Sequence, residues 1–206
     1  MKVLLINGSP HKNGCTNRAL EEVAASLENN GIESEIFWIG NGNIRGCSVC
    51  EKCGGSSNVC IYDDEVNIAL KKMQESDGLI VGTPVYFASL NGALCSFLDR
   101  MFFAGSCFTH KPAAAVASAR RAGTTATLDI IQKYFMINQM PLVSSQYWNM
   151  VHGSKPADVE QDLEGLQTMR TLGKNMAWML KCIEAGKKAG IECPETEPKI
   201  KTNFAR

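Results

Sequence analysis

Four of the chain's nine cysteines lie close together: Cys47, Cys50, Cys53 and Cys60. Two residues separate each of the first three, and six separate the third from the fourth. Thiolates at this compact spacing wrap a chain around one metal body, as ferredoxin loops do around an iron–sulfur cubane. Zinc sites more often pair two well-separated cysteine knuckles. The spacing therefore favours an iron–sulfur site, with residues 54–57 as the turn that returns Cys60; zinc or metal-free thiols are the alternatives.

A run of small polar residues, from Asn7 to Asn17, follows the first apolar segment. Ser9, Thr16 and Asn17 can each hydrogen-bond a phosphate oxygen, and Lys12 supplies charge. Two glycines permit close backbone approach, and the helix expected next offers free N–H groups at its start. Because neither a dinucleotide fingerprint nor a nucleoside triphosphate loop is present, the segment predicts a cradle for one phosphomonoester. The alternative is an ordinary strand-to-helix turn capped by Thr16 or Asn17.

Two further loops have an unusual composition. Tyr86 and Phe87 are adjacent aromatic residues just after a predicted strand, where water is near, and they favour a flat ligand there. The alternative is that both pack into a satellite core. Pro84 stiffens the same loop. Residues 118–125 form a small polar segment with two adjacent arginines, each of which alone is typical of a solvated surface.

These loops require a scaffold that brings them together. Short apolar runs predict strands at 2–7, 35–39, 78–82, 113–118 and 142–148. Helical spacing of apolar residues predicts helices at 16–29, 64–75, 92–103, 123–138 and about 157–185. Strands that alternate with helices predict an α/β fold, a doubly wound parallel sheet with helices on both faces. Because such sheets bind ligands at the carboxyl ends of their strands, we expect the three loops to meet at that edge.

Several motifs in combination resemble one family. Residues 8–17, residues 82–87 and the sequence Leu-Asp-Arg at 98–100 resemble the flavodoxin-like NADPH-dependent FMN reductase superfamily. The likeness extends through residues 147–149 and 162–166, so it covers nearly the whole chain. The cysteine spacing resembles the iron–sulfur flavoprotein branch, in which four such cysteines hold a 4Fe–4S cluster. The resemblance implies a flavodoxin-like five-stranded parallel sheet with strand order 2-1-3-4-5.

The resemblance also implies roles for individual residues. The first loop would hold the FMN phosphate, the second would lie along the isoalloxazine, and the third would close the pocket. The implied FMN-binding residues are Ser9, His11, Lys12, Asn13, Thr16, Asn17, Pro84, Val85, Tyr86, Phe87, Ser118, Arg120 and Gly123. The implied cluster ligands are Cys47, Cys50, Cys53 and Cys60. His11 stands where relatives commonly carry Arg, and Cys15 where they carry a polar residue, so we expect weaker phosphate binding.

The function implied is an FMN-dependent oxidoreductase that passes electrons from NAD(P)H or a reduced protein donor to an acceptor. The flavin carries the chemistry, so no side chain is expected to act as a general base. One alternative is an electron-transfer flavoprotein without a dedicated small-molecule substrate, served by a ferredoxin-like partner. Another is a cluster-free NAD(P)H reductase of quinone, nitro or azo compounds. Relatives are dimers or tetramers, so the resemblance implies a homodimer or homotetramer.

Composition narrows the function classes. The chain has 206 residues, with 21 Lys and Arg against 21 Asp and Glu. This zero net charge argues against nucleic acid or an anionic membrane as the main partner, and simple flavodoxins are usually strongly acidic. No apolar run reaches the ~20 residues of a spanning helix, and no signal peptide is evident. Crowded cysteines suggest a reducing compartment, so we expect a cytoplasmic protein.

The expected domain organisation is one flavin-binding domain over residues 1–190, with a cysteine-rich insertion at 40–62 and a C-terminal arm at 191–206. Two further groups of residues are candidates for a role. His152 is expected to be structural rather than part of a substrate pocket. Asp99 and Arg100 are expected to form an ion pair that anchors a helix to the sheet, or an oligomer contact.

Overall fold

The computed structural model describes residues 1–53, 57–198, 200 and 202. Its centre is one five-stranded sheet in which every neighbouring pair of strands is parallel and the order is β2-β1-β3-β4-β5. The strands are β1 (Lys2–Asn7), β2 (Glu33–Trp38), β3 (Gly78–Pro84), β4 (Ala113–Ala119) and β5 (Met150–His152). The predicted α/β class and strand order are therefore confirmed.

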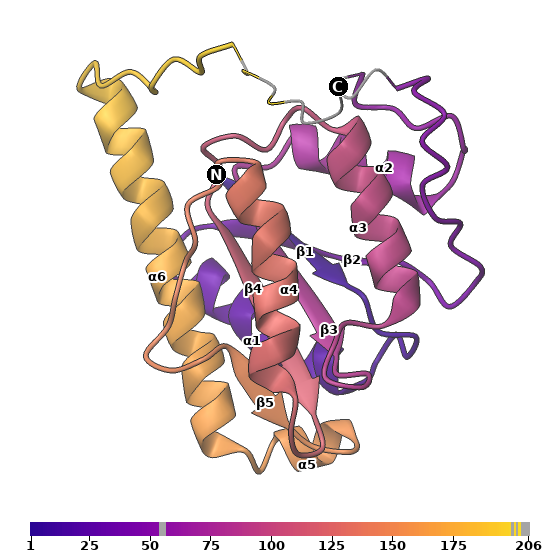
Figure 1. Ribbon diagram of the computed structural model, residues 1–206. Coiled ribbons are helices and arrows are strands. Elements are labelled where there is room, and N and C mark those ends of the chain that lie inside the picture. Colours follow the sequence, from indigo (N-terminus) through magenta and orange to yellow (C-terminus); the bar gives the residue numbers. More distant parts are fainter. Residues whose placement is uncertain (54–56, 199, 201, 203–206) are drawn as a thin grey trace.

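Helices cover both faces of the sheet (Figure 1). They are α1 (Cys15–Asn29), α2 (Glu65–Gln74), α3 (Gly92–Ala104), α4 (Thr124–Ile137), α5 (Pro156–Val159) and α6 (Leu163–Lys188). Because side chains alternate along a strand, β1 sends Leu4 and Ile6 into a core shared with α2, α3 and α4. Val3 and Leu5 enter a second core shared with α1 and α6. Within the described ranges, no helix has the length and apolarity to cross a membrane.

Helix α3 illustrates how local sequence positions the site. Leu94, Phe97, Leu98 and Met101 recur at helical spacing and are fully buried. The cap residue Asn91 accepts a hydrogen bond from the Leu94 N–H at 3.0 Å, and its amide donates to the Gly8 carbonyl at 2.5 Å. One side chain therefore starts the helix and fixes the loop after β1.

The predicted fifth strand at 142–148 is wrong. The strand is Met150–His152, paired with the end of β4, and Leu142 makes only an isolated bridge to Ala113. Tyr147 and Trp148 are about half exposed and pack edge to face on one another, with ring centroids 4.7 Å apart. Because these aromatic side chains lie at the surface, the buried strand begins only after them.

The predicted helix at 157–185 is two helices, α5 and α6, separated by residues 160–162. Asp162 causes the break, because its carboxylate accepts the Gly165 N–H at 2.9 Å as the cap of α6. The same carboxylate accepts the His152 N–H at 2.6 Å. Asp162 thus ties the start of α6 to the end of β5, at the lower edge of the sheet in Figure 1.

Candidate functional site

A cavity of about 430 Å³ opens at the edge of the sheet where β1, β3 and β4 end. Four loops contribute to it, namely those after β1, β3, β4 and β5. The lining residues are Ser9, His11, Asn13, Gly14, Cys15, Thr16, Pro84, Val85, Ser118, Ala119, Arg120, Gly153, Ser154, Lys155 and Pro156. The structure therefore brings together the three loops that the sequence singled out and adds a fourth.

Buried hydroxyl groups form part of the lining. Thr16 and Ser118 are almost fully buried, and their hydroxyl oxygens lie 2.8 Å apart in a hydrogen bond that joins the first turn of α1 to the end of β4. Ser9, also buried, accepts the His11 N–H at 3.1 Å through its hydroxyl oxygen. Gly14 begins helix α1 without a side-chain cap, so the first-turn N–H groups are left for a ligand. Hydroxyls and a helix N-terminus together suit an anion such as phosphate.

Two residues expected to bind phosphate lie outside the lining. The Lys12 ammonium is 5.9 Å from the centroid of the Trp38 ring. Asn17 accepts a hydrogen bond from the Asn7 amide at 3.1 Å and donates to Glu21 at 2.6 Å. The Asn7 amide also donates to the Lys12 carbonyl at 3.0 Å. The Asn17 side chain therefore holds the shape of the loop, and the Lys12 side chain lies near Trp38 rather than in the cavity lining.

The loop after β3 divides into two parts. Pro84 and Val85 line the cavity, whereas Tyr86 is half exposed and Phe87 is fully exposed. Tyr86 and Ser89 exchange two backbone hydrogen bonds, and the two residues between them, Phe87 and Ala88, have φ of +50° and +57°. Such a tight hairpin normally uses Asn or Gly, so this backbone is strained. The apolar wall of the cavity is therefore Pro84 and Val85, with an aromatic tip outside it.

Gly123 is required by this hairpin, although it does not line the cavity. It has φ of +91°, and a Cβ atom there would lie 2.9 Å from Ala88 Cα and 3.0 Å from Val85 Cγ1. Glycine therefore allows the loop after β4 to pass in close contact with the loop after β3.

The loop between β5 and α5 was missed by the sequence reasoning. It contributes Gly153, Ser154 and Lys155 to the lining, and Pro156 at the start of α5 follows them. The sequence does carry an indication of this loop, because Lys155 and Pro156 follow closely after the end of β5. The misplaced strand at 142–148 put these residues well beyond the sheet edge. His152 stays outside the lining, and its Nε2 lies 3.1 Å from the Arg121 carbonyl oxygen.

The cavity is electropositive. Arg120 and Lys155 contribute two basic side chains, and the lining within the described part of the chain includes no Asp or Glu. Cys15 lies at the start of α1, 3.5 Å from the Gly153 carbonyl oxygen. Burial, together with the nearby charge of Asp158, raises the pKa of the Cys15 thiol, so it stays neutral. The volume, the anion cradle and the short apolar wall all fit a phosphorylated flat ligand.

The cysteine loop is built differently. Cys47 and Cys50 are exposed, Cys60 is partly buried, and Cys53 is buried against the core of α2 and α3. Across the described residues, no three His, Cys, Asp or Glu side chains are gathered as a metal-binding group. The predicted turn at 54–57 lies outside the described residues except for Ser57, whose N–H donates to the Cys53 carbonyl at 3.0 Å. The four-cysteine ligand set stays a prediction.

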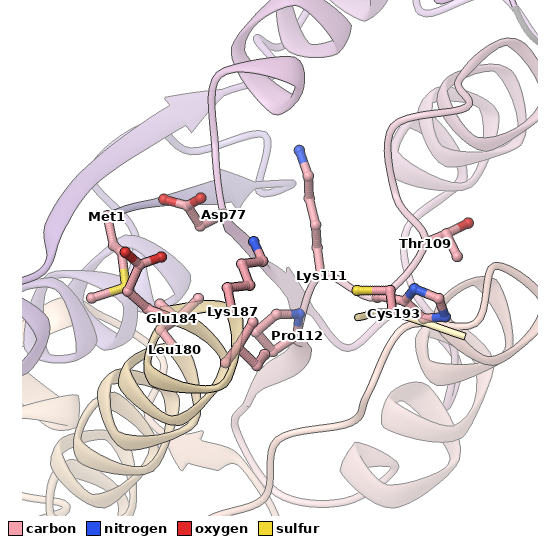
Figure 2. A pocket seen from close by; sticks show the side chains of 11 residues that line it. Met1, Asp77, Thr109, Lys111, Pro112, Leu180, Glu184, Lys187 and Cys193 are labelled. Carbon is pink, nitrogen blue, oxygen red and sulfur yellow. The ribbon is translucent and has the colours of Figure 1, made fainter. Parts of the chain in front are cut away.

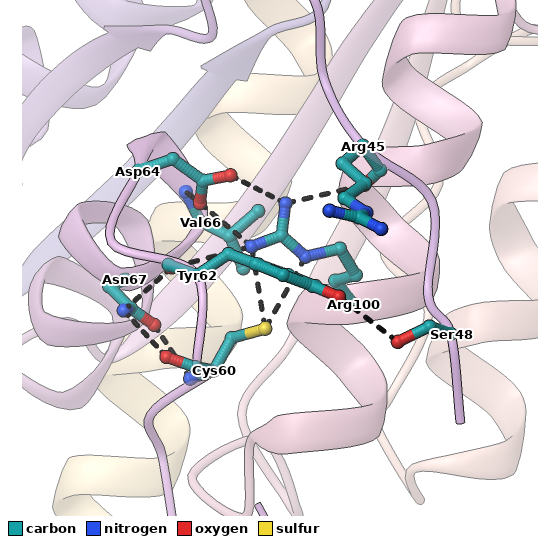
Figure 3. A network of polar contacts seen from close by, with 8 residues as sticks. All are labelled: Arg45, Ser48, Cys60, Tyr62, Asp64, Val66, Asn67 and Arg100. Atoms are coloured by element: carbon teal, nitrogen blue, oxygen red, sulfur yellow. Dashed lines mark hydrogen bonds and ion pairs between the residues drawn. The ribbon is translucent and has the colours of Figure 1, made fainter. Parts of the chain in front are cut away.

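A buried arginine anchors one end of this loop (Figure 3). Arg100 on α3 is 1% exposed, and its guanidinium donates to both Asp64 oxygens at 2.6 and 2.8 Å. Its Nε and Nη2 each lie 3.4 Å from Cys60 Sγ. The expected Asp99–Arg100 ion pair is therefore wrong. Arg100 pairs with Asp64, the cap of α2, and Asp99 accepts a hydrogen bond from Tyr134. The Arg100–Asp64 pair joins α3 to the cysteine loop and not to the sheet.

A second cleft, of about 180 Å³, lies at the opposite edge of the sheet, near residues that precede β1, β3 and β4 (Figure 2). Its charged residues are of both signs and some are engaged in the fold. Lys111 donates to the Met73 carbonyl at 2.8 Å, and burial lowers the pKa of its ammonium. Asp77 accepts the Lys2 N–H at 2.8 Å. This cleft lacks the anion cradle of the larger cavity.

Comparison with known proteins agrees with this geometry. The family model described as NADPH-dependent FMN reductase matches residues 1–155. Iron-sulfur flavoprotein MJ1083 of Methanocaldococcus jannaschii is 34% identical over 193 residues, covering 89% of this chain and 100% of that protein. An iron-sulfur flavoprotein of Methanosarcina thermophila is 27% identical over 195 residues, covering 89% and 97%.

Solved structures share the fold at low identity. RosB, crystallised with 8-demethyl-8-formylriboflavin-5'-phosphate, has a TM-score of 0.70 and 14% identity, covering 100% of this chain and 92% of that chain. A flavodoxin from the domain Archaea has a TM-score of 0.60 and 15% identity, covering 88% and 99%. The chain thus belongs to the NADPH-dependent FMN reductase family, in its iron–sulfur flavoprotein branch, and is a flavin-dependent oxidoreductase.

Proposed function

We propose that this chain passes electrons from NAD(P)H or a reduced protein donor, through FMN, to an acceptor, with a 4Fe–4S cluster as a second redox centre. The observation that carries the FMN part is the electropositive cavity at the carboxyl edge of the sheet, with its buried hydroxyls and free helix N-terminus. The family match supports the same reading. The names of the relatives support the cluster.

The cavity residues divide the work of holding FMN. Ser9, Thr16 and the first turn of α1 would bind the phosphate, while Arg120 and Lys155 offset its charge. The apolar side chains of Pro84 and Val85 would pack on the ring system and exclude water. When bound, FMN supplies two-electron acceptance from a nicotinamide and release of single electrons.

The cysteine donor set fits an iron–sulfur cluster in its chemistry. Cys47, Cys50, Cys53 and Cys60 offer four soft sulfur ligands at compact spacing, which suits iron–sulfur clusters and zinc. Near Cys60, Arg45 and Arg100 both lie over the Tyr62 ring, 4.7 and 5.1 Å from its centroid, and Asp64 offsets one charge. The Arg100 guanidinium, whose Nε and Nη2 face Cys60 Sγ, favours an anionic group there. When bound, the cluster supplies one-electron storage.

We also propose that the active form is a homodimer or homotetramer. The support is Phe87, which is fully exposed at the tip of a strained hairpin beside the cavity. Apolar exposure and backbone strain at one point favour a contact surface. Light scattering of wild type and Phe87→Ser tests this: we expect the wild type to be oligomeric and the variant to dissociate more readily. A monomeric wild type contradicts the proposal.

Anaerobic purification followed by quantification of flavin, iron and zinc tests the central proposal. We expect about one FMN and about four iron atoms per chain, with no zinc. A sample that shows no flavin absorbance after FMN is supplied contradicts the FMN proposal. Zinc near one per chain without iron contradicts the cluster.

Steady-state assays then separate the enzyme from an electron-transfer module. NADH and NADPH are tested as donors against quinone, nitro and azo acceptors, with free FMN as the control. Turnover above that of free FMN supports the enzyme. No such turnover, together with rapid reduction by a ferredoxin, supports the module.

A further inference from the structure

Arg100 is among the largest fully buried side chains of the protein, and it is cationic. A buried guanidinium needs partners for its N–H groups and its charge. Asp64 accepts from Nη1 and Nη2 in an end-on bidentate pair. The Nε and Nη2 groups also point at Cys60 Sγ, each at 3.4 Å. Figure 3 shows Arg100 between Asp64 and Cys60.

The sulfur contact is not explained by the ion pair alone. A neutral thiol is a weak hydrogen-bond acceptor, whereas a thiolate or a metal-bound sulfur carries negative charge and accepts well. The backbone of Cys60 is fixed as well, because its N–H donates to Asn67 Oδ1 at 2.7 Å and its carbonyl accepts the Asn67 amide at 2.9 Å. Both the main chain and the sulfur of Cys60 are therefore held, unlike those of the exposed Cys47 and Cys50.

We infer that Arg100 is a positioning residue for the cluster, which orients Cys60 as a ligand and makes the reduction potential of the cluster more positive. This inference rests on the proposed iron–sulfur function. Reduction adds one electron, supplied by the flavin or a protein donor, and takes up no proton, so the ligand sulfurs become more negative. Hydrogen bonds and positive charge at a ligand sulfur stabilise the reduced form more than the oxidised one.

A purely structural role for Arg100, as a clamp between α3 and the cap of α2, makes a different prediction. If the role of Arg100 were only structural, substitutions would change folding stability, but they would not shift the reduction potential of the cluster in a direction set by charge. Two variants separate these roles. Arg100→Lys keeps the charge but loses the fork that reaches sulfur and carboxylate together. Asp64→Asn keeps a good helix cap and leaves Arg100 facing Cys60, while it removes the neighbouring negative charge.

The experiment is an anaerobic redox titration of the purified holoprotein, followed by electron paramagnetic resonance of the reduced cluster, with iron measured for each sample. We expect the midpoint of the cluster to become more negative in Arg100→Lys and more positive in Asp64→Asn. Arg18→Lys, which alters a partly buried arginine that pairs with Glu22 on α1, is the matched control and should leave the midpoint unchanged. The flavin potential should stay the same in all four samples.

Two results overturn the inference. In one, wild type and both variants hold full iron, and the cluster midpoints of the two variants are unchanged or shift in the same direction. The cluster proposal is then supported, and Arg100 has only a structural role between α3 and α2. In the other, the wild type itself holds no iron, which contradicts both the proposed cluster and this inference. If Arg100→Lys fails to fold, the midpoint of Asp64→Asn decides alone, since an unchanged value contradicts the role of charge at Cys60.

Discussion

The cavity and the cysteine loop are two regions of one molecule that are held in different ways. The cavity lies at the ends of regular strands, and hydrogen bonds such as Thr16 to Ser118 connect the helix and strand ends that line it. The cysteine loop connects β2 to α2, and its described residues 40–53 and 57–63 contain neither helix nor strand. Its anchors are short stretches: Arg100 and Asn67 hold Cys60, and Asn58 exchanges hydrogen bonds with residues 104 and 106 at the end of α3. A sheet can preform a ligand site, whereas a loop without such support gains its final geometry with its metal.

The backbone of the loop shows the same contrast. Val49, Glu51 and Asn58 have φ of +50°, +59° and +58°, a region that non-glycine residues adopt at a cost. In the cavity, strain is confined to the aromatic tip outside the lining. The comparison predicts that FMN binding and metal binding can be removed separately.

The largest expected effect is the loss of iron from cysteine variants. Cys60→Ser and Cys53→Ser should each lower iron from about four atoms per chain to nearly none, because the hard oxygen of serine replaces a soft sulfur ligand. FMN content should stay near that of the wild type, since the cavity does not involve these residues. Parallel iron and flavin assays measure both.

Cys182→Ser is the matched control, because Cys182 is exposed on α6 and away from the loop. It should keep its full iron. Loss of FMN together with iron in the Cys60 and Cys53 variants would break the contrast between the two regions.

A smaller effect is expected where the cavity loops touch. Gly123→Ala should lower the free energy of unfolding by about 3 kcal/mol, since a positive φ costs about 1–2 kcal/mol and forced overlap adds a similar amount. The overlap is with the backbone of Ala88, and its displacement should also weaken FMN binding. Urea unfolding and FMN titration measure the two consequences.

Gly31→Ala separates strain from overlap. Gly31 also has a positive φ, +76°, but a Cβ atom there has no neighbour within 4 Å. This variant should lose about 1 kcal/mol of stability and keep its FMN affinity. If Gly123→Ala and Gly31→Ala lost equal amounts of stability and of FMN affinity, contact between the loops after β3 and β4 would not contribute to FMN binding.

Charge at the cavity should have a moderate effect on affinity. Lys155→Met should weaken FMN binding about fivefold at low salt, because an exposed ion pair contributes about 1 kcal/mol at most. Riboflavin, which lacks the phosphate, should bind wild type and variant equally. Lys174→Met, an exposed lysine on α6, is the control. An equal loss for riboflavin would place Lys155 away from the phosphate.

The smallest expected effect concerns the support of helix α1. Although burial works against the Glu22 carboxylate, hydrogen bonds from Arg170 and Arg18 hold its pKa below the ordinary value of 4.5. Because the pKa of Glu22 is lowered on folding, its interactions with Arg170 and Arg18 stabilise the fold fully above the ordinary pKa of 4.5. This stabilisation is lost as the pH falls through the folded-state pKa of Glu22. Glu22→Gln should therefore cost about 0.5 kcal/mol at neutral pH, since Arg170 is half exposed.

Urea unfolding of Glu22→Gln and wild type across pH measures this difference, which should vanish in acid. Because Glu22 lies away from both regions, FMN and iron content should not change. A difference that grows as the pH falls would contradict the assigned sign.

Much of the fold could be predicted from the sequence because buried strands and amphipathic helices have clear periods. The continuous apolar run of β1 and the spacing of α3 are examples. The fifth strand was misplaced because β5 has only three residues, and the aromatic pair Tyr147 and Trp148 imitated a buried strand. That error also hid Lys155 and its neighbours.

The candidate site was predicted at the level of loops better than at the level of side chains. Three loops meet where parallel strands end, as topology requires. Which side chains face the cavity depends on local hydrogen bonds, as for Asn17 and Lys12. The outward turn of Phe87 depends on backbone angles that residue type did not suggest. The pairing of Arg100 with Asp64 and Cys60 joins residues 36 and 40 positions apart, which no local pattern reveals.

The most direct test is a titration of iron-free wild-type protein with FMN, in which binding is monitored by the quenching of flavin fluorescence. We predict saturable binding of one FMN per chain without any metal, because the sheet edge builds that cavity by itself. The absence of saturable binding, in a sample that unfolds cooperatively and is therefore folded, would contradict the assignment of the cavity.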